Sequence, residues 1–208
     1  MLVYSVISPH PPIIIPEIGG AEIEKVKKTI SALESAAKEL AGVKPEKIVI
    51  ISPHTEHGFE VPLFYLSKYL SSDAELEKIL VTNPSYEYYY ELGKDYGKKI
   101  KEKKQRIAVV ASGDLSHVLT NNGPYGFDPY GPKLDKIIVD AVKDNDVDSL
   151  LNISLDTLER GAECGLRSIL FLFGVFNGTN YDTKVLSYEG PFGVGYIVAT
   201  LDPEGDRK

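Results

Sequence analysis

The segment Lys47-Ile-Val-Ile-Ile-Ser52 decides the fold class of this chain. A nearly continuous run of β-branched and aliphatic residues is typical of a parallel strand that is buried on both faces. Leu2–Ser8 and Ile107–Ser112 follow the same pattern. Because a parallel sheet needs helices to cover its two faces, these three segments predict an α/β protein.

Helical segments alternate with these strands. Lys184–Ser187 and Gly193–Leu201 are expected to close the sheet, and Val61–Tyr65 is expected to form an outer strand or a hairpin. The sequence therefore predicts one domain over residues 1–208, with a central, mostly parallel or mixed sheet flanked by helices. Apolar residues at helical spacing predict helices at Ala21–Ala41, Tyr86–Lys104, Pro132–Lys143, Ser154–Arg160 and Glu163–Phe176.

Composition excludes several classes of function. The formal net charge is −7, and no basic patch with interleaved aromatic residues occurs, which argues against binding to nucleic acid or to an anionic membrane. No apolar run approaches the roughly 20 residues that span a bilayer. The one cysteine, Cys164, cannot form an internal disulfide, so we expect a reducing compartment and a cytoplasmic protein.

All four histidines follow predicted strands or lie near their ends. His10 lies in a Ser-Pro-His turn after the first strand, and His54 lies in a second Ser-Pro-His turn that continues to His57. His117 ends the segment Ser-Gly-Asp-Leu-Ser-His after the third strand. A solvated loop position would explain any one of them, but the carboxyl ends of parallel strands meet at one edge of a sheet, where ligands bind. The set therefore predicts a site at that edge.

A metal explains this set better than a nucleophilic triad does. Imidazole binds Fe, Zn and Cu, and two histidines with one carboxylate form the facial triad of non-haem Fe(II) oxygenases. Glu163 is the candidate carboxylate, because it precedes an apolar helix whose N-terminus favours the charged form. A helix-capping role for Glu163 is the alternative. A zinc hydrolase is a further alternative, since the same ligand types form catalytic zinc sites.

Four motifs together resemble those of a known family. SPHPPIIIPEIG, ISPHTEHG, SGDLSH and GAECG are similar to the LigB-type catalytic subunit of class III extradiol ring-cleavage dioxygenases. They resemble most closely the dioxygenase-like branch associated with AMMECR1-type domains, and the related Memo proteins. The resemblance implies a LigB-like fold in which His10, His54 and Glu163 bind Fe(II), with Zn(II) or Cu as alternatives.

The resemblance also implies roles beside the metal. His117 falls at the position of the family's acid–base histidine, and Asp114 would either orient it or cap a turn. His57 would face the pocket or support a ligand through a ring N–H. Cys164 is either a small buried residue or, as in Memo-like relatives, a participant in the site.

The activity that the resemblance implies is cleavage of the ring of a small aromatic diol with O2, at a bond next to the diol. Tyr125, Phe127 and Tyr130 would wall an aromatic pocket, unless they serve only loop packing. The alternative is a Memo-like metal-binding redox or accessory protein without ring-cleaving activity. Such a protein would work with an AMMECR1-type or radical-SAM partner. We expect a homo-oligomer in either case.

Overall fold

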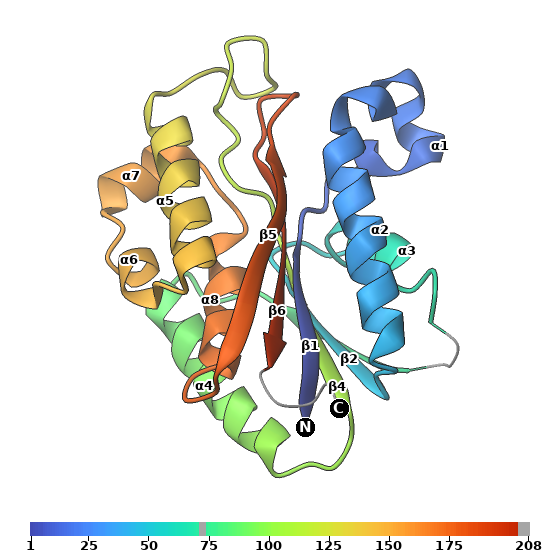
Figure 1. Cartoon of the computed structure of the whole chain (residues 1–208). Coiled ribbons are helices and arrows are strands. Elements are labelled where there is room, and N and C mark those ends of the chain that lie inside the picture. The colour runs from blue at the N-terminus through green and yellow to red at the C-terminus, as the bar shows by residue number, and fades with distance from the viewer. Residues whose placement is uncertain (71–73, 204–208) are drawn as a thin grey trace.

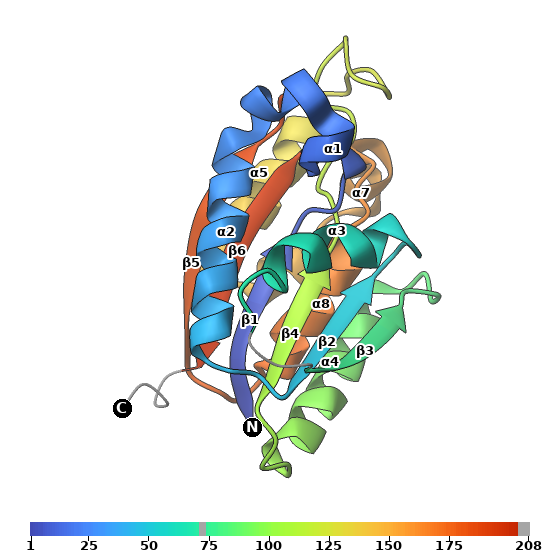
Figure 2. The same ribbon diagram turned by 90° about the vertical axis from the view of Figure 1, so that its right-hand side faces the viewer.

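One six-stranded sheet forms the centre of the computed structural model, which describes residues 1–70 and 74–203. Its strands are β1 (Leu2–Ser8), β2 (Lys47–Ser52), β3 (Glu75–Leu80), β4 (Ile107–Ser112), β5 (Tyr181–Glu189) and β6 (Tyr196–Pro203). They are arranged in the order β3-β2-β4-β1-β6-β5 (Figure 2). The first four strands of this order are parallel, and β6 joins β1 in the antiparallel direction. The sheet is therefore mixed and mostly parallel, as the sequence predicts.

Helices cover both faces of the sheet (Figure 1). One layer contains α1 (Pro16–Gly19), α2 (Lys27–Gly42) and α3 (His57–Leu66), with 3-10 turns η1 (Pro12–Ile14) and η2 (Gly20–Val26). The other layer contains α4 (Tyr86–Lys101), α5 (Tyr130–Asp144), α6 (Val147–Leu151), α7 (Leu155–Gly161) and α8 (Leu166–Val175). None of the described helices has the length and apolar character needed to cross a membrane.

The β2 strand shows why the continuous apolar pattern predicts this fold. Val49 and Ile51 pack into the core on the α4–α8 side, whereas Ile48 and Ile50 pack into the core on the α2–α3 side. Successive strand residues point to opposite faces, so a strand covered on both faces needs apolar residues at every position.

Two of the predicted elements, those at Val61–Tyr65 and Ala21–Ala41, differ in type or starting point from the structure. The prediction of a strand or hairpin at Val61–Tyr65 is wrong, because these residues belong to α3. The buried positions of α3 recur at helical spacing from Gly58 to Leu66, a period that the short apolar window did not reveal. The predicted helix at Ala21–Ala41 begins regular α-helical geometry only at Lys27, after the 3-10 turn η2.

The edge strand β3 was not predicted. It lies at one edge of the sheet, and its sequence Glu-Leu-Glu-Lys-Ile-Leu mixes charged and apolar residues. Leu76 and Leu80 remain exposed, so the burial signal that marks the central strands is missing. Natural sheets use charged, short edge strands to prevent further strand pairing, and this protection hides such strands from an apolar pattern.

Helices α4 and α8 touch through glycines. A Cβ atom added at Gly93 would lie 2.1 Å from the carbonyl oxygen of Phe171, and one added at Gly174 would lie 2.2 Å from that of Tyr90. Each glycine thus permits a backbone approach that no other residue allows. This contact fixes α8, and α8 follows directly after the GAECG segment.

Gly93→Ala should destabilise the protein by about 1–3 kcal/mol, because the added methyl group forces the two helices apart. Gly42→Ala is the matched control, since no atom lies within 4 Å of its added Cβ and alanine favours a helix. Urea unfolding midpoints measure both effects. An unchanged midpoint for Gly93→Ala would show that the helix contact is looser than described.

Candidate metal centre

Three parallel strands end at the same level with a buried serine. Ser8 of β1 pairs with Ser112 of β4, and Ser52 of β2 follows the pair Ile51–Ala111. All three serines are inaccessible to solvent. Because the strands are parallel and in register, the segments that follow them leave the sheet together. This arrangement brings the histidine-bearing turns to one place.

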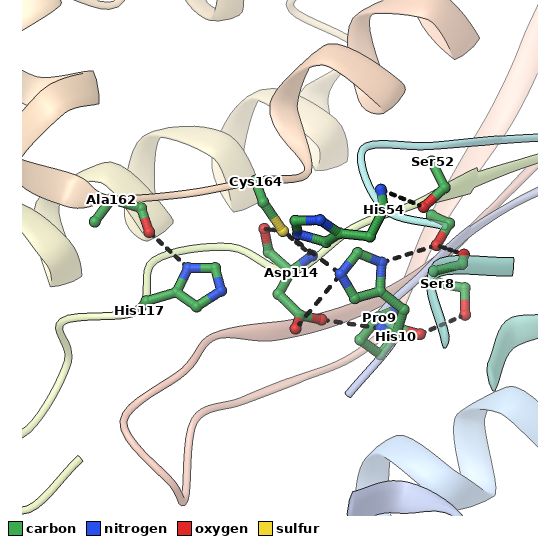
Figure 3. Close-up of polar contacts among 11 residues, drawn as sticks. Ser8, Pro9, His10, Ser52, His54, Asp114, His117, Ala162 and Cys164 are labelled. Carbon is green, nitrogen blue, oxygen red and sulfur yellow. Dashed lines mark hydrogen bonds and ion pairs between the residues drawn. The ribbon is translucent and has the colours of Figure 1, made fainter. Parts of the chain in front are cut away.

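His10, His54 and Cys164 form the group of possible metal ligands among the described residues. Their ligand atoms all lie within 4.8 Å of one another, and Cys164 Sγ is 3.6 Å from His10 Nε2 (Figure 3). Two ligand atoms of one zinc ion lie roughly 3–4 Å apart, given the usual bond lengths. Small side-chain adjustments are therefore enough for these three atoms to hold one ion.

A hydrogen-bond chain sets the tautomer of His10. Pro62 lies inside α3 and has no N–H, so it cannot donate to the carbonyl of Gly58 as other helical residues would. The hydroxyl of Ser112 donates to that carbonyl instead. Ser112 Oγ then accepts from Nδ1–H of His10 at 3.0 Å. The proton on Nδ1 leaves the lone pair of Nε2 free for a metal.

Asp114 holds the backbone of His10 and lies beside its ring. Its Oδ1 accepts from the backbone N–H of His10 at 3.0 Å, and its Oδ2 is 3.9 Å from Nε2. Burial, followed by the neighbouring His54 and His57, lowers the pKa of His10 to about 3. Burial also raises the pKa of Asp114 to about 7. The imidazole is therefore neutral at physiological pH, the form that binds metals.

Cys164 is held in place by backbone contacts. A Cβ atom added at Gly113 would lie 2.2 Å from Cα of Gly165, so the segment after β4 and the turn before α8 meet without side chains. The backbone N–H of Asp114 donates to Sγ at 3.3 Å, and its carbonyl accepts from the N–H of Gly165 at 2.9 Å. Burial raises the pKa of the Cys164 thiol well above its ordinary value in the metal-free protein.

Glu163 is not brought into this group. One oxygen of its buried carboxylate accepts from the hydroxyl of Tyr86 at 3.0 Å, and the other accepts from the N–H of Leu166 at 2.5 Å. Glu163 thus caps α8, which is the alternative that the sequence left open. Adjacent residues in a turn point in different directions, so the place expected for Glu163 beside the histidines is taken by Cys164.

His117 lies near the group but apart from it (Figure 3). Its Nδ1–H donates to the carbonyl of Ala162 at 2.6 Å, which leaves Nε2 free to accept a proton. Ala162 has a left-handed conformation (φ 51°) that ends α7 and turns this carbonyl toward the ring. Burial lowers the pKa of His117 below its ordinary value.

His57, at the start of α3, completes the histidine cluster. Its ring centroid lies 5.6 Å from those of both His10 and His54. The ring centroids of His10 and His54 are 5.2 Å apart. His57 therefore faces the site, although its ring nitrogens are outside the group that can share one ion.

The predicted aromatic wall is only partly present. The ring of Tyr125 stands edge-on to His117, with centroids 5.4 Å apart. Phe127 is exposed, and its backbone bridges to Leu119. The ring of Tyr130 packs against the guanidinium of Arg160. Tyr125 is thus the aromatic residue of this loop that the described contacts place beside a site histidine.

Comparison with known proteins agrees with this geometry. Residues 55–199 match the family described as the catalytic LigB subunit of aromatic ring-opening dioxygenase. The chain belongs to the LigB family. The match includes Asp114, His117 and Cys164 but begins just after His54, so it does not include His10 or His54.

Two comparisons show how far the similarity extends. Protein CA_C1420 of Clostridium acetobutylicum is 29% identical, and the alignment covers 93% of this LigB-family chain and 56% of that protein. The chain thus spans about half the length of this relative. The crystal structure of the uncharacterized protein JW3007 from Escherichia coli K12 has a TM-score of 0.59 and 12% identity, covering 96% of this chain and 99% of that one. At this identity, the likeness shows a shared fold.

Cys164→Ser should weaken zinc binding by at least about 10-fold, whereas Glu163→Gln should leave it nearly unchanged. A serine hydroxyl replaces the thiolate poorly, while a glutamine can keep the capping contact of Glu163 with α8. Calorimetric titration of the metal-free variants with Zn(II) measures both affinities. If Glu163→Gln abolishes binding and Cys164→Ser retains it, then Glu163 is the third ligand.

Metal binding at pH 8 should release about one proton. The pKa of the Cys164 thiol is raised, so the thiol keeps its proton at this pH and must lose it to bind a metal. The ligand histidines, whose pKa values are lowered, are already neutral, and pH 8 is above the pKa of Asp114. Zinc affinity should therefore rise with pH. Titration in two buffers of different ionisation enthalpy counts the protons, and Cys164→Ser should release almost none.

Proposed function

We propose that this protein is a LigB-family metalloprotein that binds Cu(I) or Zn(II) through His10, His54 and Cys164. It acts as a redox or accessory protein of the Memo-like kind. The observation that carries the proposal is the position of the Cys164 thiol, 3.6 Å from Nε2 of His10, in the place expected for a carboxylate.

The donor set supports a soft or borderline ion. Thiolate ligands select Cu(I) and Zn(II), whereas Fe(II) oxygenases of the facial-triad type use two histidines and a carboxylate. The carboxylate of Glu163 would have to give up both the Tyr86 hydroxyl and the N–H of Leu166 in order to bind a metal. Leaving that helix N–H unpaired would cost about 1–3 kcal/mol.

The ion would supply Lewis acidity or one-electron redox chemistry, according to its identity. The chain's own residues would handle protons. Nε2 of His117 can take a proton from a molecule bound beside the metal, because Nδ1–H is held by Ala162. Asp114, with a pKa of about 7, would balance the charge next to His10.

Ring cleavage is the second candidate function. Family membership and the free Nε2 of His117 favour it, and Tyr125 offers an aromatic surface beside that histidine. The reaction would join a small aromatic diol with O2, break one ring carbon–carbon bond and place both oxygen atoms in a muconic semialdehyde. It would require Fe(II) in a site that contains a thiol.

Partner proteins belong to the same proposal. The Clostridium relative is nearly twice as long as the region it shares with this chain, which supports cooperation with a further protein. An AMMECR1-type or radical-SAM protein is the partner class that the sequence resemblance suggests. Self-association to a homo-oligomer is proposed as well, and light scattering of the purified protein measures it.

Anaerobic competition between Cu(I), Zn(II) and Fe(II) should show that Fe(II) binds most weakly, by at least about 10-fold, because Fe(II) lies below Zn(II) in the general affinity order and a thiolate also selects Cu(I) and Zn(II). Mass spectrometry of the protein after dialysis measures the retained metal. Addition of catechol and O2 to the Fe(II)-loaded protein then tests the second candidate, since ring cleavage gives a yellow product. A catechol turnover that falls about 100-fold in His117→Phe, with metal retained, would establish ring cleavage instead.

A further inference from the structure

Tyr196, the first residue of β6, is a buried phenol beside Asp114, the residue that contacts His10. It is 2% exposed, and its ring packs in an apolar cluster with Ile14, Val194 and Val198. It belongs to an apolar strand that carries no sequence motif. Its position makes it a candidate for contact with whatever binds at the site.

The hydroxyl of Tyr196 has no hydrogen-bond partner among the residues that the structure describes. Other buried tyrosines differ: Tyr65 donates to the carbonyl of Ile14, and the hydroxyl of Tyr89 accepts from two backbone N–H groups. Within the described ranges, the fully enclosed side-chain oxygens that lack a partner are those of Ser5, Ser168 and Ser187. The Tyr196 oxygen is not among them, so it reaches space that solvent can enter.

Backbone pairing places Tyr196 beside Asp114. The N–H of Leu115 donates to the carbonyl of Gly195, and the N–H of Gly195 donates to the carbonyl of Ser116. These antiparallel bonds align the start of β6 with the segment after β4, so Asp114 and Tyr196 are neighbours. Burial, followed by the negative charge of Asp114, raises the pKa of Tyr196, which keeps its hydroxyl proton in place.

We propose that the Tyr196 hydroxyl contacts the ligand of the metal centre and donates a hydrogen bond to an oxygen of a small diol or oxyanion. Because this hydroxyl makes no hydrogen bond to the described protein and opens to space that solvent can enter, a ligand oxygen could take the place of water as its acceptor. Asp114 is the shared neighbour of the two groups, because its Oδ2 lies 3.9 Å from His10 Nε2 and the backbone pairing sets it beside Tyr196. This inference rests on the proposed function in one respect, that the centre binds a metal and a small oxygen-containing molecule.

The test compares Tyr196→Phe with Tyr65→Phe, using 4-nitrocatechol as the probe. Absorbance titrations of zinc-loaded and metal-free protein measure affinity, and thermal unfolding measures stability. Tyr196→Phe should weaken probe binding by about 10-fold or more, because it removes a hydrogen bond to a charged oxygen. Its melting temperature should stay the same or rise, since the lost hydroxyl has no partner in the protein. Tyr65→Phe should show the opposite pattern, with lower stability and unchanged probe binding.

Several outcomes would overturn the inference. Equal probe affinity of Tyr196→Phe and the unmutated protein would do so, as would an absence of probe binding to zinc-loaded protein. A clear loss of stability in Tyr196→Phe would assign the hydroxyl a structural role. Zinc content, measured separately, distinguishes these results from a failure of the proposed function. If zinc does not bind but the metal-free protein binds the probe through Tyr196, then the inference stands and the metal centre does not.

Discussion

The parallel register of β1, β4 and β2 is the constraint on which the site depends. It puts Ser8, Ser52 and Ser112 at one level, so that the turns after them start from a common line. The hydroxyl of Ser52 accepts a hydrogen bond from the backbone N–H of His54, and the hydroxyl of Ser112 accepts one from Nδ1–H of His10. A shift of one strand by a single residue would turn its terminal serine to the other face of the sheet and separate the two imidazoles.

A proline inside α3 also helps to fix the ring of His10. Proline inside a helix normally weakens it, because one carbonyl loses its partner. In α3 the freed carbonyl of Gly58 accepts from Ser112, and Ser112 in turn fixes the ring of His10. The backbone of one helix thus determines which nitrogen of a histidine on another element is available. Burial of the serine keeps water from replacing either contact.

The sequence predicted the central strands and the meeting of the histidines, because both depend on patterns that are local in the chain. Continuous apolar runs mark strands buried on two faces, and the Ser-Pro-His turns directly follow two of them. It favoured Glu163 over Cys164 as the third ligand, whereas the structure groups Cys164 with the two histidines. Cys164 faces the histidines and Glu163 does not, because the backbone contact of Gly113 with Gly165 sets the direction of the turn. Such a contact joins segments far apart in the chain, so no local pattern reports it. The edge strand β3 was missed because its charges resemble those of a solvated loop.

The glycine contact between α4 and α8 links the position of the Cys164 thiol to the packing of the whole helix layer. Cys164 lies two residues before α8, and α8 is held against α4 by direct backbone approach at Gly93 and Gly174. A transient separation of these helices would carry the sulfur away from the two imidazoles, which belong to the opposite layer and the strand ends. The lifetime of a bound ion would then be set by how often this layer opens, and not by ligand strength alone. The rate of metal dissociation would then report how often α4 and α8 separate.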